Sequence, residues 1–374
     1  MYMNRRQVTF GLAAFGLSAC AGQTVSSTQT GLPDDLRPVP NSSYDAWVSS
    51  FLPRARSAGL SDSTLTAGFR NTGYLPGVVR RDRNQTEFKR SLEDYLSIAV
   101  SDERVSQGKA ALQRHGTVLR SLEATYGVDA EIITAIWGLE SFYGARRGNV
   151  PVVSATSTLA YDGRRGAFFE KQLIAALEIL QSGDTTSDKL VGSWAGAMGH
   201  TQFIPTSYQA FAVDFTGDGR RDIWSDDPSD ALASAAAYLQ RNGWVRGETW
   251  GREITSGGGG LQPQPGGPRF ATTRNFTVIK RYNNSDAYAI GVGHLADRID
   301  GAGPLQTPFP PDVNGLTKDD RIALQEGLTS AGFDTQGSDG VIGPNTESAI
   351  RAYQASVGLE VTGRPSQALL ARLR

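Results

Sequence analysis

Residues 129–143, which read DAEIITAIWGLESFY, decide the fold of this chain because they form one strongly apolar segment with helical spacing. Asp129 is suited to cap the start of a helix, and Glu131 is favourably placed in its first turn. The pattern therefore predicts a helix that continues from Ile132 to Tyr143.

Glu140 is the unusual residue of this segment. It lies four residues after Ile136 and seven after Ile133, on the face that the helix should bury. A carboxylate is costly there unless it is paired, hydrogen-bonded or chemically active. Burial without a cation raises the pKa of a carboxyl group and keeps it protonated, as a general acid requires. The alternative is a structural glutamate satisfied by an arginine or a helix cap.

Other segments also predict helices, so the fold class expected is mainly α. One helix should run from Ala167 to Gln181 and stop at Gly183. Another should be capped by Asp230, continue to Arg241 and stop at Gly243. Its apolar stripe predicts ordinary core positions: Leu232, Ala235, Ala236 and Leu239. Residues 256–267 are glycine-rich and predict a loop within the same domain.

Composition excludes several classes of protein. The 374 residues are 39% hydrophobic and 20% charged, with a formal net charge of −1. Such a balance excludes a disordered chain and a protein with many membrane spans. It also argues against nucleic acid as a partner, because phosphate binding would require a basic excess.

The N-terminus predicts export and lipid attachment. Arg5 and Arg6 precede a short apolar run, and residues 17–20 read LSAC, which matches a lipobox with Cys20 as the acylated residue. The apolar run is too short for a transmembrane helix, which is the alternative reading. Ala21 after the cysteine favours the periplasmic face of the outer membrane. The arginine pair leaves twin-arginine export open beside the general secretory route.

The chain divides into five parts by composition. Residues 1–20 are the signal peptide, and 21–41 form a flexible tether rich in Ser, Thr, Gln and Pro. The expected catalytic domain covers 42–300, a Pro-rich linker covers 301–315, and a small helical domain covers 316–374.

A second distinctive string, WAGAMGHTQFIP at residues 194–205, supports a chemical role for Glu140. Further short motifs follow in order: VDFTGDG at 213–219, NGW at 242–244 and RYNNS at 281–285. Together with Glu140, this set resembles the membrane-bound lytic transglycosylase B family from Tyr44 to Ile299. Small residues within the string would let backbone segments approach closely.

The resemblance implies a lysozyme-like helical catalytic domain with a saccharide groove and Glu140 as its catalytic acid and base. The side chains that it places in the groove are Ser193, Gln202, Phe203, Tyr238, Tyr282, Asn283 and Tyr288, with Tyr95, Arg164 and Arg165 aligned less closely. For the tyrosines, core packing is the alternative, although a tyrosine hydroxyl favours contact with water or with a hydrogen-bond partner.

The implied reaction cuts the glycan strands of peptidoglycan without water and without a catalytic metal or cofactor. One glutamate protonates the glycosidic oxygen and then accepts the C6 hydroxyl proton, which leaves a 1,6-anhydro end. A muramidase that hydrolyses the same bond would need a second carboxylate, and the sequence identifies none. A non-catalytic wall-anchoring lipoprotein would leave Glu140 without a role. The other partners expected are outer-membrane lipid and proteins of cell-wall synthesis or division.

Residues 214–222, DFTGDGRRD, have oxygen-bearing side chains at alternate positions and glycine at the sixth, like the first half of an EF-hand loop. Ser225 stands where the usual glutamate would close the shell, so Asp226, Asp227 or Asp230 would have to complete it. The family carries a cation site here, and the resemblance implies a structural Ca²⁺ bound by this loop. The expected ligands are Asp214, Thr216, Asp218, Arg220 and Asp230. A solvated Asp/Gly turn is the alternative.

Residues 316–374 resemble a three-helix peptidoglycan-binding domain. The similarity rests on GF at 332–333, on DGVIGPNT at 339–346 and on AIRAYQ at 349–354. Asn345 or Thr346 is expected to cap the helix that follows. An inert packing module is the alternative, because the same small fold occurs in other enzymes.

Overall fold

The computed structural model describes residues 31–84 and 91–374. The expected signal peptide, Cys20 and the first part of the tether lie outside the described residues. Among the described residues, no helix is both long and apolar enough to cross a membrane.

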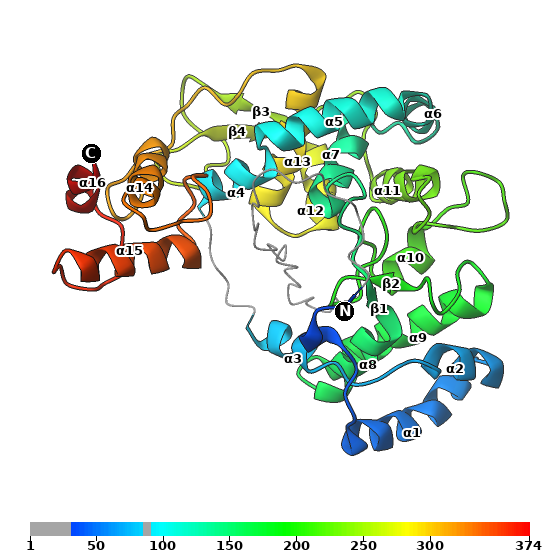
Figure 1. Cartoon of the computed structure of the whole chain (residues 1–374). Helices are drawn as coiled ribbons and strands as arrows, with labels where there is room; N and C mark the ends of the chain where they lie inside the picture. The colour runs from blue at the N-terminus through cyan, green and yellow to red at the C-terminus, as the bar shows by residue number, and fades with distance from the viewer. Residues whose placement is uncertain (1–30, 85–90) are drawn as a thin grey trace.

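The large domain consists of two groups of helices (Figure 1). The first group surrounds one hydrophobic core and the second surrounds two. The first lobe contains α4 (Leu92–Ala99), α5 (Asp102–Arg114), α6 (Gly116–Tyr126), α7 (Ala130–Ser141), α11 (Ser229–Arg241), α12 (Arg274–Tyr282) and α13 (Asp286–Asp300). The second lobe contains α1 (Ser42–Ser57), α2 (Asp62–Phe69), α3 (Pro76–Arg83), α8 (Val152–Asp162), α9 (Gly166–Ser182) and α10 (Pro205–Phe211). The chain leaves α7 and enters the second lobe directly, so the end of α7 lies where the lobes meet.

Helix α7 is the centre of the first lobe. Every residue of this 12-residue helix is buried except Glu131 and Glu140. Asp129 occupies the N-cap position as expected, but its side chain makes no capping hydrogen bond. The helix ends at Ser141 rather than at Tyr143, because the next two residues adopt positive φ angles of 51° and 57°. The chain therefore reverses direction, and the Tyr143 side chain packs back against α7. A Cβ on Gly138 would lie 2.6 Å from the Tyr143 hydroxyl oxygen.

The remaining predicted helices agree with the structure in position but not in every cap. Helix α9 ends at Ser182, and its C-cap is the predicted Gly183, whose φ of 82° only glycine adopts easily. The apolar stripe of α11 is fully buried, as expected. The expected Asp230 cap is wrong, because α11 begins one residue earlier, after Pro228, and no side chain caps it.

Two short antiparallel strand pairs join these helices. Strands β1 (Val150–Pro151) and β2 (Val191–Gly192) pair Val150 with Gly192 beside the end of α7. Strands β3 (Gly251–Ile254) and β4 (Arg269–Thr272) flank the expected 256–267 loop and make it a hairpin connection. The loop is predicted by its sequence, but the two strands beside it, only four residues each, were not predicted.

Residues 31–41, the later part of the expected tether, are folded against the second lobe. The 3-10 helix η1 (Asp34–Leu36) buries Leu36 to 5% exposure against Leu75 and Val78. Val39 pairs with Tyr74 as a β-bridge, and Asn41 caps α1 by accepting a hydrogen bond from the Tyr44 amide. Burial of Leu36 fixes this segment on the second lobe.

The C-terminal domain contains α14 (Lys318–Ser330), α15 (Pro344–Ser356) and α16 (Gln367–Leu373), so the expected three-helix fold is confirmed. Their apolar faces form a separate core that includes Leu324, Ile350 and Leu370. The cap prediction for α15 is wrong. Gly343 occupies the N-cap and Pro344 starts the helix, since proline lacks the amide hydrogen that a cap would satisfy.

A buried arginine joins this domain to the catalytic domain. Arg321 on α14 is 3% exposed and lies 2.7 Å from Glu93 and 3.0 Å from Asp94, at the start of α4. Its remaining donors bond the carbonyl groups of Gly340 and Leu316. We call this group the Arg321 joint. In Figure 1 the domain accordingly lies beside α4.

Candidate active site

Glu140 meets Tyr288 at the junction of α7 and α13. The Tyr288 hydroxyl donates a 2.6 Å hydrogen bond to Glu140 Oε1. Tyr288 is 1% exposed, whereas Glu140 retains partial exposure. Ser285 caps α13 by accepting a hydrogen bond from the Tyr288 amide, which fixes the first turn that carries this tyrosine. The carboxyl group is therefore held at one oxygen by a rigid partner.

Burial raises the pKa of Glu140 to about 7, and the hydrogen bond from Tyr288 opposes part of this rise. The negative end of the α7 dipole also disfavours a carboxylate at this position. Among the described residues, neither an arginine nor a second carboxylate contributes to the shift. The alternative of a glutamate satisfied by an arginine is thus excluded within this part of the chain. Near neutral pH both protonation states of Glu140 are accessible.

Three of the expected groove aromatics pack together beside this pair. The ring centroids of Tyr238 and Tyr282 are 4.9 Å apart, and Phe203 lies 5.8 Å from Tyr282. The Tyr282 hydroxyl donates to the Thr201 carbonyl at 2.7 Å. Phe203 is only 2% exposed, so its ring supports the two tyrosines and is not itself a groove surface.

Ser193 and Gln202 are placed by the tightly folded string at 192–203. A Cβ on Gly192 would lie 2.1 Å from the Ala197 carbonyl oxygen, so only glycine allows this approach. The Ser193 hydroxyl accepts the amide of Ala197 at 3.1 Å, and Gln202 Nε2 donates to the Arg147 carbonyl at 3.0 Å. The close approach of backbone segments expected for the 194–205 string is confirmed at Gly199, where a Cβ would lie 2.3 Å from the Ile223 carbonyl oxygen.

Tyr95 and Asn283 lie on neighbouring elements of the same lobe. Tyr95 on α4 packs against Gly291 of α13, where a Cβ would approach its ring to 2.9 Å. It is close enough to Tyr288 to influence that residue's pKa. Asn283 ends α12, and its carbonyl accepts the Ser285 amide at 2.7 Å. Tyr95 therefore borders the Glu140–Tyr288 pair, whereas Asn283 lies in the short turn between α12 and α13.

Arg164 and Arg165 belong to a separate group. Both bind Asp82, which is 2% exposed, with Arg164 Nε at 2.5 Å and Arg165 Nη2 at 3.0 Å. Burial alone would raise the pKa of Asp82, but the two guanidinium groups hold it below its usual range. The structure thus gives these arginines a carboxylate partner in the second lobe and no contact with Glu140.

The hydrogen bonds that hold the end of α7 were not predicted from the sequence. The Ser141 hydroxyl donates to the His200 carbonyl at 2.6 Å, and Trp137 Nε1 donates to His200 Nδ1 at 3.1 Å. His200 was visible as the one titratable residue of the 194–205 string, but nothing in the sequence indicates that its partners lie on α7. These bonds fix the residues on either side of Glu140.

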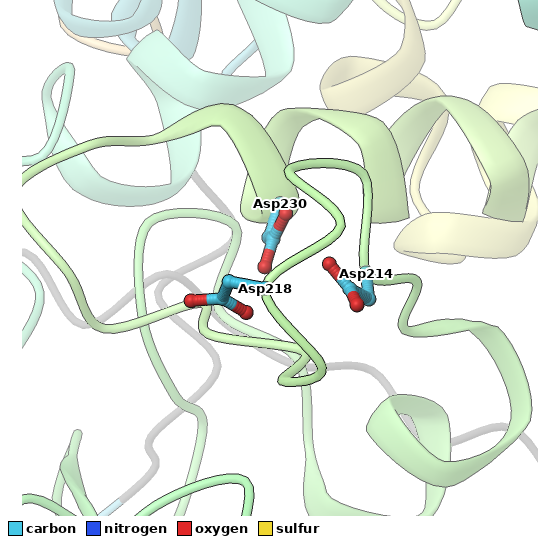
Figure 2. A group of neighbouring side chains, drawn as sticks. All are labelled: Asp214, Asp218 and Asp230. Carbon is cyan, nitrogen blue, oxygen red and sulfur yellow. The ribbon is translucent and has the colours of Figure 1, made fainter.

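The loop at 214–222 brings acidic side chains together (Figure 2). Asp214, Asp218 and Asp230 each offer a carboxylate oxygen, and these oxygens lie within 4.8 Å of one another. Asp230 also accepts the amides of Phe215 at 2.9 Å and Thr216 at 3.0 Å. It therefore anchors the loop instead of capping α11.

These residues fit a calcium ion. The three carboxylates have no basic partner among residues 31–84 and 91–374, so they make an oxygen-rich, negatively charged cluster of the kind that Ca²⁺ prefers. Burial raises the pKa of Asp230, against the opposing effect of its backbone hydrogen bonds. Thr216 adds a hydroxyl group 3.3 Å from Asp214 Oδ1, and the Arg220 amide donates to Asp218 Oδ1 at 2.9 Å. Asp226 instead binds Arg147, and Asp227 binds Ser229, so neither belongs to this cluster.

A family model described as a transglycosylase SLT domain matches residues 43–262 and 259–297. The chain belongs to this transglycosylase family. A second model, a putative peptidoglycan binding domain, matches residues 317–373. The expected family, enzyme class and mainly helical fold are thereby confirmed.

Individual relatives of this SLT-domain chain agree with that membership. Membrane-bound lytic murein transglycosylase B of Escherichia coli (strain K12) is 36% identical over 155 residues, which are 41% of this chain and 42% of that protein. The crystal structure of SltB3 from Pseudomonas aeruginosa in complex with NAG-NAM-pentapeptide has a TM-score of 0.71 and 41% identity, covering 89% of this chain and 100% of that chain. Escherichia coli Slt35 in complex with calcium has a TM-score of 0.60 and 26% identity, covering 70% of this chain and 93% of that one.

Proposed function

We propose that this SLT-domain protein cleaves the β-1,4 bond between N-acetylmuramic acid and N-acetylglucosamine in peptidoglycan, without water, and leaves 1,6-anhydro ends. The observation that carries the proposal is the one carboxyl group at the junction of α7 and α13, that of Glu140. Desolvation raises its pKa to about 7, and among the described residues no second carboxylate contributes to this shift. A hydrolase that activates water would need such a second group. One group that both gives and accepts a proton needs a pKa near the working pH.

The proposed reaction uses Glu140 twice. Its proton passes to the glycosidic oxygen as the bond from C1 of the muramic acid breaks, and the sugar's N-acetyl oxygen stabilises the positive charge at C1. The Glu140 carboxylate then removes the proton from the C6 hydroxyl, and O6 bonds to C1. Glu140 ends protonated, as it began. Tyr288 keeps the carboxyl group oriented through both steps.

Product mass tests this proposal. Digested sacculi should yield fragments that carry anhydro ends and are lighter by one water than hydrolysed fragments. Glu140→Gln, which keeps the size of the side chain, should lower the rate by a factor of about 10³ or more while leaving the fold intact. Reducing ends in the wild-type products would assign the chain to the muramidases instead.

We also propose that the protein is a periplasmic lipoprotein of the outer membrane, exported by the signal at 1–20 and acylated at Cys20. The sequence supports this placement through the LSAC motif and Ala21. Metabolic labelling with a fatty acid, followed by membrane fractionation, tests it. Cys20→Ala should abolish both the label and the association with outer-membrane fractions.

The proposal also includes a structural cation site and a wall-binding domain. The loop at 214–222 would hold a structural Ca²⁺ through Asp214, Asp218 and Asp230, with no part in the chemistry. The C-terminal domain would bind the wall polymer, and proteins of wall synthesis or division would associate with the enzyme. Pull-down of insoluble peptidoglycan by the whole protein, with and without residues 316–374, measures the contribution of that domain.

A further inference from the structure

A cavity lies on the side of α7 that the expected groove does not use. It has a volume of about 420 Å³ and is lined by α5, by the turn that follows α7, and by the loop near Asp226. None of its lining residues belongs to the groove set expected from the sequence. Its volume falls in the range of ordinary small-ligand sites.

The floor of this cavity is aromatic and uncharged. Trp137 and His200 are 3% and 4% exposed and are joined by the hydrogen bond described above. Burial lowers the pKa of His200 to about 4, so its ring is neutral at physiological pH. The ring of His115 meets Trp137 edge-on at 5.3 Å. Such a floor favours the apolar part of a ligand over its charged part.

The rim, in contrast, carries two arginines, Arg114 and Arg147, and one carboxylate, Asp226, which pairs with Arg147. Arg147 is fixed by the carbonyl groups of Trp224 and Ser225, at 2.8 and 2.9 Å, and by Asp226 at 2.9 Å. Arg114 is exposed and, among residues 31–84 and 91–374, has neither an ion pair nor a hydrogen bond through its side chain. A guanidinium group with five free donors is suited to a carboxylate, which it can bind through two parallel hydrogen bonds.

The cavity and the Glu140 site share a wall. The Arg147 carbonyl accepts a hydrogen bond from Gln202, and the His200 carbonyl accepts one from Ser141, which follows Glu140 directly. Two residues of this wall, Phe142 and Tyr143, have positive φ angles, so the turn is held in an unfavourable conformation by its surroundings. A ligand in the cavity would therefore contact the elements that position the catalytic carboxyl group.

We infer that this cavity binds a peptide stem of the wall polymer, with Arg114 holding a stem carboxylate at the rim and the aromatic floor covering an apolar side chain. The inference rests on the proposed function, since it takes the stem from the same polymer that Glu140 would cut. A stem peptide combines carboxylates with small apolar side chains, as the rim and the floor require. It would bind outside the saccharide groove and increase the retention of peptide-bearing strands.

Binding of the free stem pentapeptide, without sugar, tests this site separately from catalysis. Isothermal titration uses the full-length Glu140→Gln protein, in which no turnover occurs. Two further substitutions address the cavity: Arg114→Gln removes the free charge, and Ala110→Trp places a large ring over the opening from the exposed side of α5. Arg120→Gln, an exposed arginine on α6 outside the cavity, is the matched control.

We expect the pentapeptide to bind, with about tenfold weaker affinity after Arg114→Gln and a larger loss after Ala110→Trp. The Arg120→Gln control should bind as tightly as its parent. The site is refuted if the pentapeptide does not bind, or if the control loses as much affinity as the two cavity variants. Thermal melts of each variant show whether it is folded. Peptide binding without anhydro products from the wild-type enzyme would instead contradict the proposed function alone.

Discussion

The hydroxyl of Tyr288 lies 2.6 Å from Glu140 Oε1 and donates its hydrogen bond to that oxygen. A donor favours the ionised carboxylate, whereas burial favours the protonated acid, and burial is the larger effect. The balance leaves the pKa of Glu140 at about 7, where a group can serve as an acid and then as a base.

Loss of the Tyr288 hydroxyl should favour the protonated form of Glu140. In Tyr288→Phe the pKa of Glu140 should rise by about one unit, because a hydrogen bond to the charged form is lost. Glu140 must be protonated to start the reaction, so activity declines as pH rises through its pKa. The alkaline decline of kcat/KM should therefore shift to higher pH.

Tyr282→Phe is the control for that shift, since its hydroxyl bonds the Thr201 carbonyl and not Glu140. The alkaline decline of kcat/KM in Tyr282→Phe should occur at the same pH as in the wild type, even if the KM of the variant rises. Coincident limbs for Tyr288→Phe and the wild type would show that Tyr288 does not tune Glu140.

The raised pKa also predicts how stability depends on pH. Folded Glu140 holds its proton up to about pH 7, whereas the unfolded residue releases it near 4.5. The folded state binds more protons between these values, so the free energy of unfolding falls as pH rises through this window. The penalty is absent below pH 4.5 and complete above pH 7, where it amounts to about 3 kcal/mol.

Glu140→Gln removes this penalty. Its free energy of unfolding should equal that of the wild type near pH 4.5 and exceed it at pH 8, as denaturant titrations at both values would measure. A difference between the two proteins that does not change with pH would mean that burial does not raise the pKa of Glu140.

Calcium should stabilise the catalytic domain through the cluster in Figure 2. At a calcium concentration 100 times its Kd, the gain would be about 2.7 kcal/mol. Calorimetry after chelation and after calcium addition should show a rise in Tm for the wild type and little or none for Asp218→Asn. Asp218 is chosen because, besides its place in the cluster, its side chain bonds only the Arg220 amide within the part of the chain that the structure describes. Asp45→Asn, on exposed α1, should keep the full response, and an equal rise in Asp218→Asn would place the ion elsewhere.

Removal of the Arg321 charge should separate the two domains. Arg321→Gln leaves Glu93 and Asp94 unpaired in a buried contact, at a cost of about 3 kcal/mol. Limited proteolysis should then cut within residues 301–315, and small-angle scattering should show a larger radius of gyration. Neutralising both acids in the same protein should restore part of the docking.

Arg351→Gln is a matched control in the same domain. Arg351 pairs with Glu347 at 3.2 Å, but both side chains are exposed, so this pair contributes little. Equal protease sensitivity in the two variants would show that the Arg321 joint does not hold the domains together.

The sequence allowed the helical fold, the position of Glu140 and the acidic loop to be predicted, because each depends on residues close together in the chain. Periodic apolar residues are enough to place α7, α9 and α11. The partners of these residues depend on distant contacts and could not be found in this way. Tyr288 is 148 residues from Glu140, and Asp82 is 82 residues from Arg164. The end of α7 was misjudged because Phe142 and Tyr143 have ordinary helix propensities and are turned only by tertiary packing.

The Arg321 joint has a consequence for how tightly the enzyme holds its polymer. A binding domain on a loose tether must search a large volume before a second contact forms, and that search reduces its effective concentration. Here the linker itself is engaged, since the Gln306 and Thr307 amides bond Glu253 at 2.8 Å. With linker and joint both fixed, the ordering entropy is lost during folding and not during each encounter with the wall. The catalytic domain and the C-terminal domain would then contact the same glycan strand at little additional entropic cost. The separation between these two contacts along the glycan would be constant.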